Sequence, residues 1–133
     1  MHSVELRIDN GSQVVTDLTA EVSDFCRTQG DGLLSVFVPH ATAGVALMEV
    51  HARSEPDLES TLERMLPIDD RYEHRHGSVG HGRDHVLPAL VSPSVTVPVF
   101  AGVPALGTWQ SIVLVDTNGD NPSRRVRLSF LPA

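Results

Sequence analysis

Histidine is the residue type whose spacing most clearly suggests chemistry. Of seven histidines, four fall within one short polar segment: His74, His76, His81 and His85. In an extended segment His74 and His76 would share a face, and in a helix His81 and His85 would do so. Neutral imidazole is the commonest protein ligand for metals, and three histidines with one open position form a catalytic zinc-type site. A solvated loop with scattered histidines is the alternative that spacing alone favours, because no His-Glu-x-x-His motif is present.

Four carboxylates are candidates for acid–base work: Glu49, Asp57, Asp70 and Asp116. Glu49 and Asp116 each end an apolar stretch, where a carboxylate is costly unless it is paired. Structural alternatives exist, since Asp57 can cap a helix and both Asp70 and Asp116 can belong to turns. No nucleophile elbow, P-loop or dinucleotide fingerprint accompanies these residues, so nothing in the sequence supports a serine hydrolase.

Candidates for substrate binding lie in the second half of the chain. Trp109, the only tryptophan, could stack on a heteroaromatic ring while Gln110 donates a hydrogen bond to it. Arg124 and Arg125 could clamp a phosphate, or they could simply form a charged strand edge. Trp109 likewise has a structural alternative in the core or in a subunit contact. The ten cationic side chains are all arginine, which excludes lysine nucleophiles and Schiff-base chemistry.

Composition narrows the class of protein further. The net charge is −7 without a basic stripe, so nucleic-acid binding is not expected. We find neither a secretory leader nor a run of about 20 apolar residues, which predicts a soluble cytoplasmic protein without a membrane span. Cys26 is the only cysteine and is expected to be a buried, inert thiol. The length predicts one domain over residues 1–133.

The hydrophobic pattern predicts an α+β fold, a mainly antiparallel, sandwich-like sheet with two or three helices. The expected strands are Ser3–Ile8, Gln13–Thr16, Gly32–Val38, Val45–Met48, Ser94–Val99, Gln110–Asp116 and Arg124–Phe130. The first two are expected to form a hairpin around the turn at residues 9–12.

Two helices are expected in the first half of the chain and a third, short one in the second half. Leu18, Val22, Phe25 and Cys26 are spaced as on a helix that ends at Gly30. A second helix begins at Ser54 and Asp57, which resemble a capping box, and its buried stripe is expected to comprise Leu58, Leu62, Met65 and Leu66. Residues 69–83 are predicted to be a loop, and residues 84–90 a short helix.

Several motifs in the chain resemble those of the YjbQ family, and they occur in the same order. The resemblance to its "HTTA…NE…DP" stretch lies in Pro39-His40-Ala41-Thr42-Ala43, Glu49 and Pro56-Asp57. The segment ending at His74 resembles its "Y-x-H" element, and His85 stands at its "A-H" position. The signature "VPV…LGTWQ" is similar to Ser94–Val99 and Leu106–Gln110, and the closing "R-R/K-V" to Arg124–Val126.

The resemblance implies a small α+β sandwich-like fold assembled as a homotrimer, with a polar pocket near the subunit contacts. It implies that His40, His74 and His85 are the pocket histidines, which suit a divalent metal such as zinc. It also implies that Thr42, Glu49, Asp57 and Gln110 are their polar neighbours. Three departures from the family pattern affect the acidic part of this pocket: Met48, Glu55 and Thr61.

Three functions follow as hypotheses. The first, implied by the resemblance, is thiamine-phosphate synthesis, which joins a pyrimidine diphosphate to a thiazole phosphate with loss of pyrophosphate. There His40, His74 and His85 would hold a metal, Arg124 or Arg125 would bind phosphate and Trp109 would stack, although histidine ligands suit zinc better than magnesium. The second is a zinc-dependent hydrolase or lyase of a small molecule, with Glu49 or Asp57 as general base. The third is a non-enzymatic trimeric protein that binds a metal or a metabolite.

Overall fold

The computed structural model describes residues 1–133, which form eight strands and three helices. The strands are β1 (His2–Asp9), β2 (Val15–Asp17), β3 (Gly32–Phe37), β4 (Ala43–Met48), β5 (Ser94–Phe100), β6 (Val103–Pro104), β7 (Ser111–Asp116) and β8 (Ser123–Pro132). The helices are α1 (Thr19–Cys26), α2 (Ser54–Met65) and α3 (His81–Leu90). Every strand pair is antiparallel, so the predicted fold class is confirmed.

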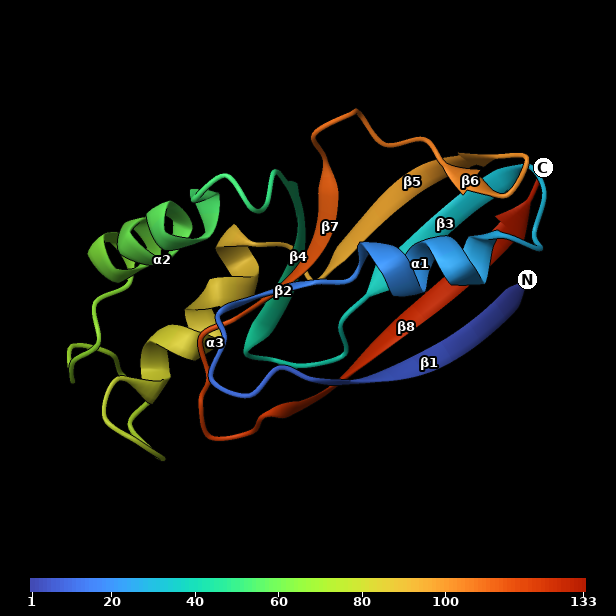
Figure 1. Cartoon of the computed structure of the whole chain (residues 1–133). Coiled ribbons are helices and arrows are strands. Elements are labelled where there is room, and N and C mark those ends of the chain that lie inside the picture. Colours follow the sequence, from blue (N-terminus) through green and yellow to red (C-terminus); the bar gives the residue numbers. More distant parts are fainter.

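The strands form two sheets that enclose the main core (Figure 1). One sheet has five strands in the order β1-β8-β3-β5-β6, and the other has three in the order β2-β7-β4. Inward-facing residues of both sheets meet in one apolar cluster, which α1 completes with Leu18, Val22 and Cys26. Cys26 is fully buried, as predicted, and burial raises the pKa of its thiol.

Strand β7 explains how α2 and α3 are attached. Its residues Ile112 and Leu114 face the main core, whereas Val113 and Val115 belong to a second cluster with Leu62, Leu66 and Leu87. A strand that is buried on both faces is apolar at every position rather than at alternate ones. The two helices therefore cover the outer face of the small sheet, at the end of the molecule opposite the two termini (Figure 1).

The predicted hairpin of the first two strands is wrong. Strand β1 pairs with β8, and β2 pairs with β7 in the other sheet. The connection between them crosses from sheet to sheet, held by a hydrogen bond from Asn10 N to Pro122 O of 2.9 Å. Pairing with β7 allows Val14 and Val15 to pack on the second cluster, which a local hairpin would not provide.

Helix α2 differs from its prediction at its start and on one face. Arg53, in the left-handed region with φ 69°, is its N-cap and makes no side-chain capping bond. Ser54 and Asp57 lie inside the helix, so they do not form a capping box. Met65 is 57% exposed, whereas Leu62 and Leu66 are buried as predicted. No helix of the chain has the length and apolar character that crossing a membrane requires.

Candidate metal centre

Helix α3 brings two of the four clustered histidines together. It begins at His81, three residues earlier than the sequence predicts, after Gly80 in the left-handed conformation with φ 78°. His81 and His85 are therefore one helical turn apart on the same face, and their Nε2 atoms are 3.0 Å apart. The face predicted for these two histidines in a helix is thus confirmed.

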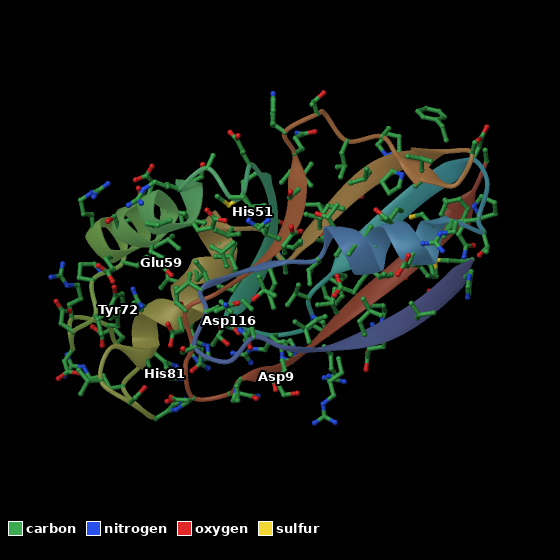
Figure 2. The ribbon with its side chains drawn as sticks, in the orientation of Figure 1. Asp9, His51, Glu59, Tyr72, His81 and Asp116 are labelled. Atoms are coloured by element: carbon green, nitrogen blue, oxygen red, sulfur yellow. The ribbon has the colours of Figure 1, made fainter.

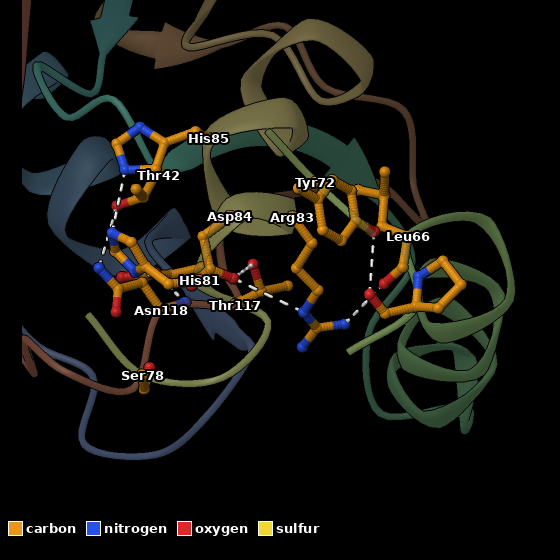
Figure 3. Close-up of polar contacts among 12 residues, drawn as sticks. Thr42, Leu66, Tyr72, Ser78, His81, Arg83, Asp84, His85, Thr117 and Asn118 are labelled. Carbon is orange, nitrogen blue, oxygen red and sulfur yellow. Dashed lines mark hydrogen bonds and ion pairs between the residues drawn. The ribbon is translucent and has the colours of Figure 1, made fainter. Parts of the chain in front are cut away.

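The segment before α3, which contains Tyr72, His74 and His76, packs against the helix and supplies the other two histidines of the cluster. A side chain at Gly82 would collide with Tyr72 Cβ at 2.5 Å and with His74 O at 2.6 Å, so only glycine permits this close approach. The buried Arg83 donates from Nη1 to Leu66 O at 3.2 Å, which anchors the segment at its other end (Figure 3). Tyr72 is fixed in turn by a 2.9 Å hydrogen bond to Pro67 O.

All four imidazoles consequently form one cluster, in which the four potential ligand nitrogens lie within 4.8 Å of one another. Ring centroids are 4.0 Å apart for His74 and His76 and 4.1 Å apart for His74 and His85. Zinc–nitrogen bonds of about 2.0 Å place ligand nitrogens about 3.3 Å from one another, so small side-chain rotations would bring these into range. The structure thereby favours the clustered site over a loop of scattered histidines.

Two observations fit this cluster to a metal ion. His74 Nε2 is buried without any hydrogen-bond partner; His81 Nδ1 also lacks one, but it faces the carboxylates of Asp84 and Asp120 and so leaves Nε2 as the ligand atom of that ring. A buried polar atom without a partner costs free energy, which a ligand can remove. Burial and the neighbouring histidines also lower the pKa of His74, and the same two causes lower the pKa of His85. The lowered pKa values favour the neutral form of both rings, which is the form in which imidazole binds a metal.

Carboxylates surround His81 on the side away from His85. Its Nδ1 lies 3.5 Å from Asp84 Oδ2 and 3.7 Å from Asp120 Oδ2. Asp84 is buried and accepts a 2.6 Å hydrogen bond from Thr117 Oγ1 (Figure 3). A carboxylate behind a ligating histidine orients the ring and fixes its tautomer, which is how Asp84 would act here.

A small cavity of about 80 Å³ opens beside His74 and His81, and Asp69 and Asp70 are among its lining residues. Both carboxylate oxygens of Asp69 accept hydrogen bonds from Arg71, which holds the pKa of Asp69 below its ordinary value. Asp70 makes no such pairing, which leaves it as the available carboxylate of this cavity.

His40 is not a member of the cluster formed within the chain. Its Nε2 accepts a hydrogen bond of 2.9 Å from the backbone N–H of Arg125, and it lines a different, polar cavity. Burial, together with Arg124 and Arg125, lowers the pKa of His40. The chain alone therefore brings together two of the three histidines implied by the resemblance, His74 and His85, and adds His76 and His81 to them.

Arg124 lies inside the protein rather than at a surface where it would meet phosphate. The residue is only 3% exposed. Its guanidinium pairs with Asp116 through Nε and Nη2 and donates to Thr42 Oγ1 at 3.2 Å. Asp116 also accepts from Asn10 Nδ2 and from Asn118 N, so its carboxylate is fully used. Thr42, Asp116 and Arg124 form a structural network that joins β8 to β7 and to the residue just before β4.

The remaining predicted residues are exposed and lie apart from the cluster. Glu49 follows β4, and Asp57 lies in the first turn of α2; neither is among the clustered groups. Trp109 is 74% exposed in the β6–β7 connection, which runs well away from α3 (Figure 1). Gln110 Oε1 accepts a 2.8 Å hydrogen bond from Gly107 N, which shapes that connection.

Sequence reasoning missed Thr117, Asp120 and the orienting role of Asp84. The available signal was the spacing of His81 and Asp84, since an acidic residue three positions after a candidate ligand shares its helical face and can orient it. Thr117 and Asp120 are distant in sequence and carry no local signal of this kind.

Comparison with known proteins places the chain in a family. The family described as "UPF0047 protein YjbQ-like" matches residues 3–133. The chain belongs to the YjbQ family. A UPF0047 protein of Mycobacterium tuberculosis is 63% identical over 126 residues, covering 95% of each chain. The YjbQ protein of Escherichia coli is 29% identical over 118 residues, covering 87% of this chain and 85% of its own.

Two solved structures share the fold. A protein of Aeropyrum pernix aligns over 100% of both chains with a TM-score of 0.90 and 29% identity. A protein of Sulfolobus solfataricus, described as YbjQ-like and of unknown function, aligns over 99% of this chain and 97% of its own with a TM-score of 0.91 and 19% identity. These descriptions name no reaction.

Proposed function

We propose that this YjbQ-family protein is a zinc-dependent hydrolase in which the clustered histidines hold the metal. The observation that carries the proposal is the convergence of four imidazole nitrogens within 4.8 Å, with His74 Nε2 buried and unpaired. An all-imidazole donor set suits zinc and disfavours magnesium, which prefers oxygen ligands.

His74, His81 and His85 would hold the ion, which leaves the side of His76 for the fourth position. Asp84 would orient His81 from behind, itself fixed by Thr117. When bound, zinc supplies a Lewis acid that polarises a substrate carbonyl or phosphoryl group and makes water nucleophilic near neutral pH.

Asp70 is the proposed general base. It lines the small cavity beside His74 and His81, and its carboxylate is not tied up by an arginine as that of Asp69 is. A free carboxylate in this place would accept the proton of the attacking water. This assignment replaces Glu49 and Asp57, because Asp70 lines the cavity beside His74 and His81 and neither of those two residues does.

Metal analysis of untagged protein tests the zinc site. We expect about one zinc per chain in the wild type and a loss of at least tenfold in affinity in a His74→Ala/His85→Ala variant, because each ligand contributes a strong bond. His51→Ala is the matched control, since His51 is an exposed histidine outside the cluster. Equal zinc content in all three proteins would contradict the site.

His40→Ala separates the two possible ligand sets. Because His40 is bonded to Arg125 N and lies outside the cluster, this variant should retain zinc. Loss of zinc from a folded His40→Ala protein would instead support the ligand set of His40, His74 and His85.

Turnover distinguishes an enzyme from a binding protein. Zinc-loaded protein is screened against phosphate, carboxylic and glycosidic esters, and Asp70→Asn is expected to lose turnover while it retains zinc. Stoichiometric zinc without turnover of any substrate class would favour the non-enzymatic metal- or metabolite-binding function.

Thiamine-phosphate synthesis is a second candidate, and one observation favours it. His40 and Arg125 line a polar cavity that could receive a phosphate. Trp109 and Arg124 give it no support, since the first is exposed far from α3 and the second is buried against Asp116. Incubation with the pyrimidine diphosphate and the thiazole phosphate, with magnesium or zinc, tests it by product analysis.

Homotrimer formation is proposed on the same chain. Large apolar side chains are exposed on the five-stranded sheet and its edge, including Phe100, Val103 and Leu131 at 63%, 64% and 56%. Such exposure favours burial against further copies of the chain. Size-exclusion chromatography with light scattering gives the mass directly, and a monomeric mass would contradict the trimer.

A further inference from the structure

A second cavity lies on the outer face of the five-stranded sheet, and its lining is rich in hydrogen-bond donors. Its volume is about 600 Å³, and only one of its lining residues is apolar. It is lined by Glu5, Leu6, Arg7, His40, Asn121, Ser123 and Arg125. Its size falls within the range of small-molecule sites and exceeds what a bare inorganic ion needs.

The pairing of β1 with β8 concentrates positive charge on this face. Arg7 stands opposite Arg125, and Glu5 stands opposite Arg127, so three guanidiniums share a face with one carboxylate of the cavity. Glu5 is already engaged, since its Oε2 accepts from Arg127 Nη2 at 3.0 Å and its Oε1 lies 3.7 Å from Arg125 Nη1, which leaves Arg7 as the arginine of the cavity without a carboxylate partner. In a chain of net charge −7, this local excess of arginine marks the cavity as an anion site.

The neutral side chains add donors rather than acceptors. His40 Nε2 accepts from Arg125 N, so the neutral ring carries its proton on Nδ1, where no protein group accepts it. Ser123 Oγ accepts from Arg7 Nε at 3.0 Å, which leaves the hydroxyl hydrogen free to donate. Asn121 Oδ1 accepts from Ser123 N at 3.2 Å, so the group of this side chain that is left for a ligand is its NH2 donor.

The cavity and the histidine cluster lie on either side of one short connection. Asp120 Oδ2 is 3.7 Å from His81 Nδ1 and accepts a 2.9 Å hydrogen bond from Ser78 Oγ, whereas the next residue, Asn121, lines the cavity. The connection at Asp120 and Asn121 is therefore the link in the chain between the cavity and the cluster.

We infer that this cavity binds the phosphate group of a small phosphorylated substrate, through Arg7, Arg125, His40 and Ser123. The inference deepens the proposed function, because it names the substrate class that the zinc site would act on. Arginine guanidiniums pair with phosphate bidentately, and this geometry matches a group with three terminal oxygens.

Binding of inorganic phosphate and of glycerol phosphate to metal-free protein tests this inference by calorimetry. We expect both to bind, the ester more tightly because the cavity exceeds one phosphate in volume. The Arg7→Gln/Arg125→Gln variant should bind each at least about tenfold more weakly, since charge-assisted hydrogen bonds are lost. Arg27→Gln is the control, because Arg27 is an exposed arginine of another surface.

Glu5→Gln gives a change of opposite sign. Removing the one carboxylate of the lining should tighten phosphate binding severalfold, because repulsion of the anion is lost and Arg127 is released. Absence of phosphate binding to folded wild type, or unchanged binding in the double arginine variant, would overturn the inference.

The two proposals fail separately in this design. The His74→Ala/His85→Ala variant should bind phosphate like the wild type, because neither histidine lines the cavity. If zinc is absent yet phosphate binds through Arg7 and Arg125, the phosphate site stands without the hydrolase. If zinc binds but phosphate does not, the zinc site stands and the substrate class is wrong.

Discussion

Two buried polar regions of this molecule differ in how completely their hydrogen bonds are satisfied. The carboxylate of Asp116 accepts from Arg124 Nε and Nη2, from Asn10 Nδ2 and from Asn118 N. In the histidine cluster, by contrast, His74 Nε2 and His81 Nδ1 are buried without a partner. Figure 2 labels one residue of each region, Asp116 and His81. Both regions are polar, but only the first has its hydrogen-bonding capacity filled.

The difference separates a structural group from a candidate site. A charge pair whose lone pairs and protons are all used has nothing left to offer a ligand, and its role is to hold β8 against β7. A buried imidazole nitrogen without a hydrogen-bond partner costs free energy until a ligand occupies it. Arg124, Asp116 and the histidines are all candidate site residues in the sequence. What distinguishes them in the structure is whether their hydrogen-bonding capacity is already filled.

The largest expected effect is on the satisfied region. Asp116→Asn leaves the buried Arg124 without a counter-charge and should lower the free energy of unfolding by about 3–5 kcal/mol. Asp24→Asn is the matched control, since it breaks an exposed pair with Arg27 and should cost about 0–1 kcal/mol. Urea unfolding of metal-free protein measures both. Equal losses in the two variants would mean that the Asp116 pair does not stabilise the fold.

An intermediate effect is expected where the two regions meet in sequence. Thr117 follows Asp116 in the chain, and its hydroxyl donates to Asp84 at 2.6 Å. Thr117→Val removes that bond at nearly constant volume, so zinc affinity should fall about tenfold as Asp84 loses its fixed orientation. The expected cost to stability is about 1 kcal/mol.

The control for this change is Thr61→Val on α2. Thr61 Oγ1 also donates one hydrogen bond, of 2.8 Å to Asp57 O, but it lies outside the cluster. Competition titrations with a zinc indicator compare the two variants. Zinc affinity that is the same in both would show that Asp84 needs no support from Thr117.

The sequence predicts the elements of this fold better than their pairing. Apolar periodicity locates β3, β5, β7 and α1 to within a few residues, because each buries a continuous face. The partner of β1 is more than 100 residues away in β8, and no local pattern indicates it. The early start of α3 is missed because Gly80 and Gly82 are typical of loops. In the structure Gly80 ends the turn before the helix, and Gly82 permits close packing inside it.

The candidate site was predictable only in part, for a related reason. The spacing of His81 and His85 indicates a shared helical face, and the structure confirms it. That His74 and His76 join them depends on the packing of the preceding segment over Gly82, a tertiary contact. Whether a charged residue is free or already paired, as with Arg124, also depends on residues that are distant in sequence.

The smallest expected effect concerns His40, which stands between the two extremes. One ring nitrogen accepts from Arg125 N, and the other is unpaired. Burial, then Arg124 and Arg125, lowers its pKa, while Asp116 and Glu5 oppose the shift. Because the unfolded chain binds the proton more readily, His40 contributes stability above its ordinary pKa of about 6.5, and this is lost as the pH falls below that value.

His40→Gln isolates this contribution, because the amide oxygen can still accept from Arg125 N. The free energy of unfolding of metal-free protein, measured at pH 7.5 and 5.5, should fall less in the variant than in the wild type. The difference should be modest, since His40 is only half-buried and its charges are partly screened by solvent. If both proteins lose the same amount, protonation of His40 is not coupled to folding. The cavity would then tolerate a charged imidazole. His40 would in that respect resemble the histidine cluster, which can still bind a ligand, rather than the Asp116–Arg124 network, whose hydrogen bonds are all made.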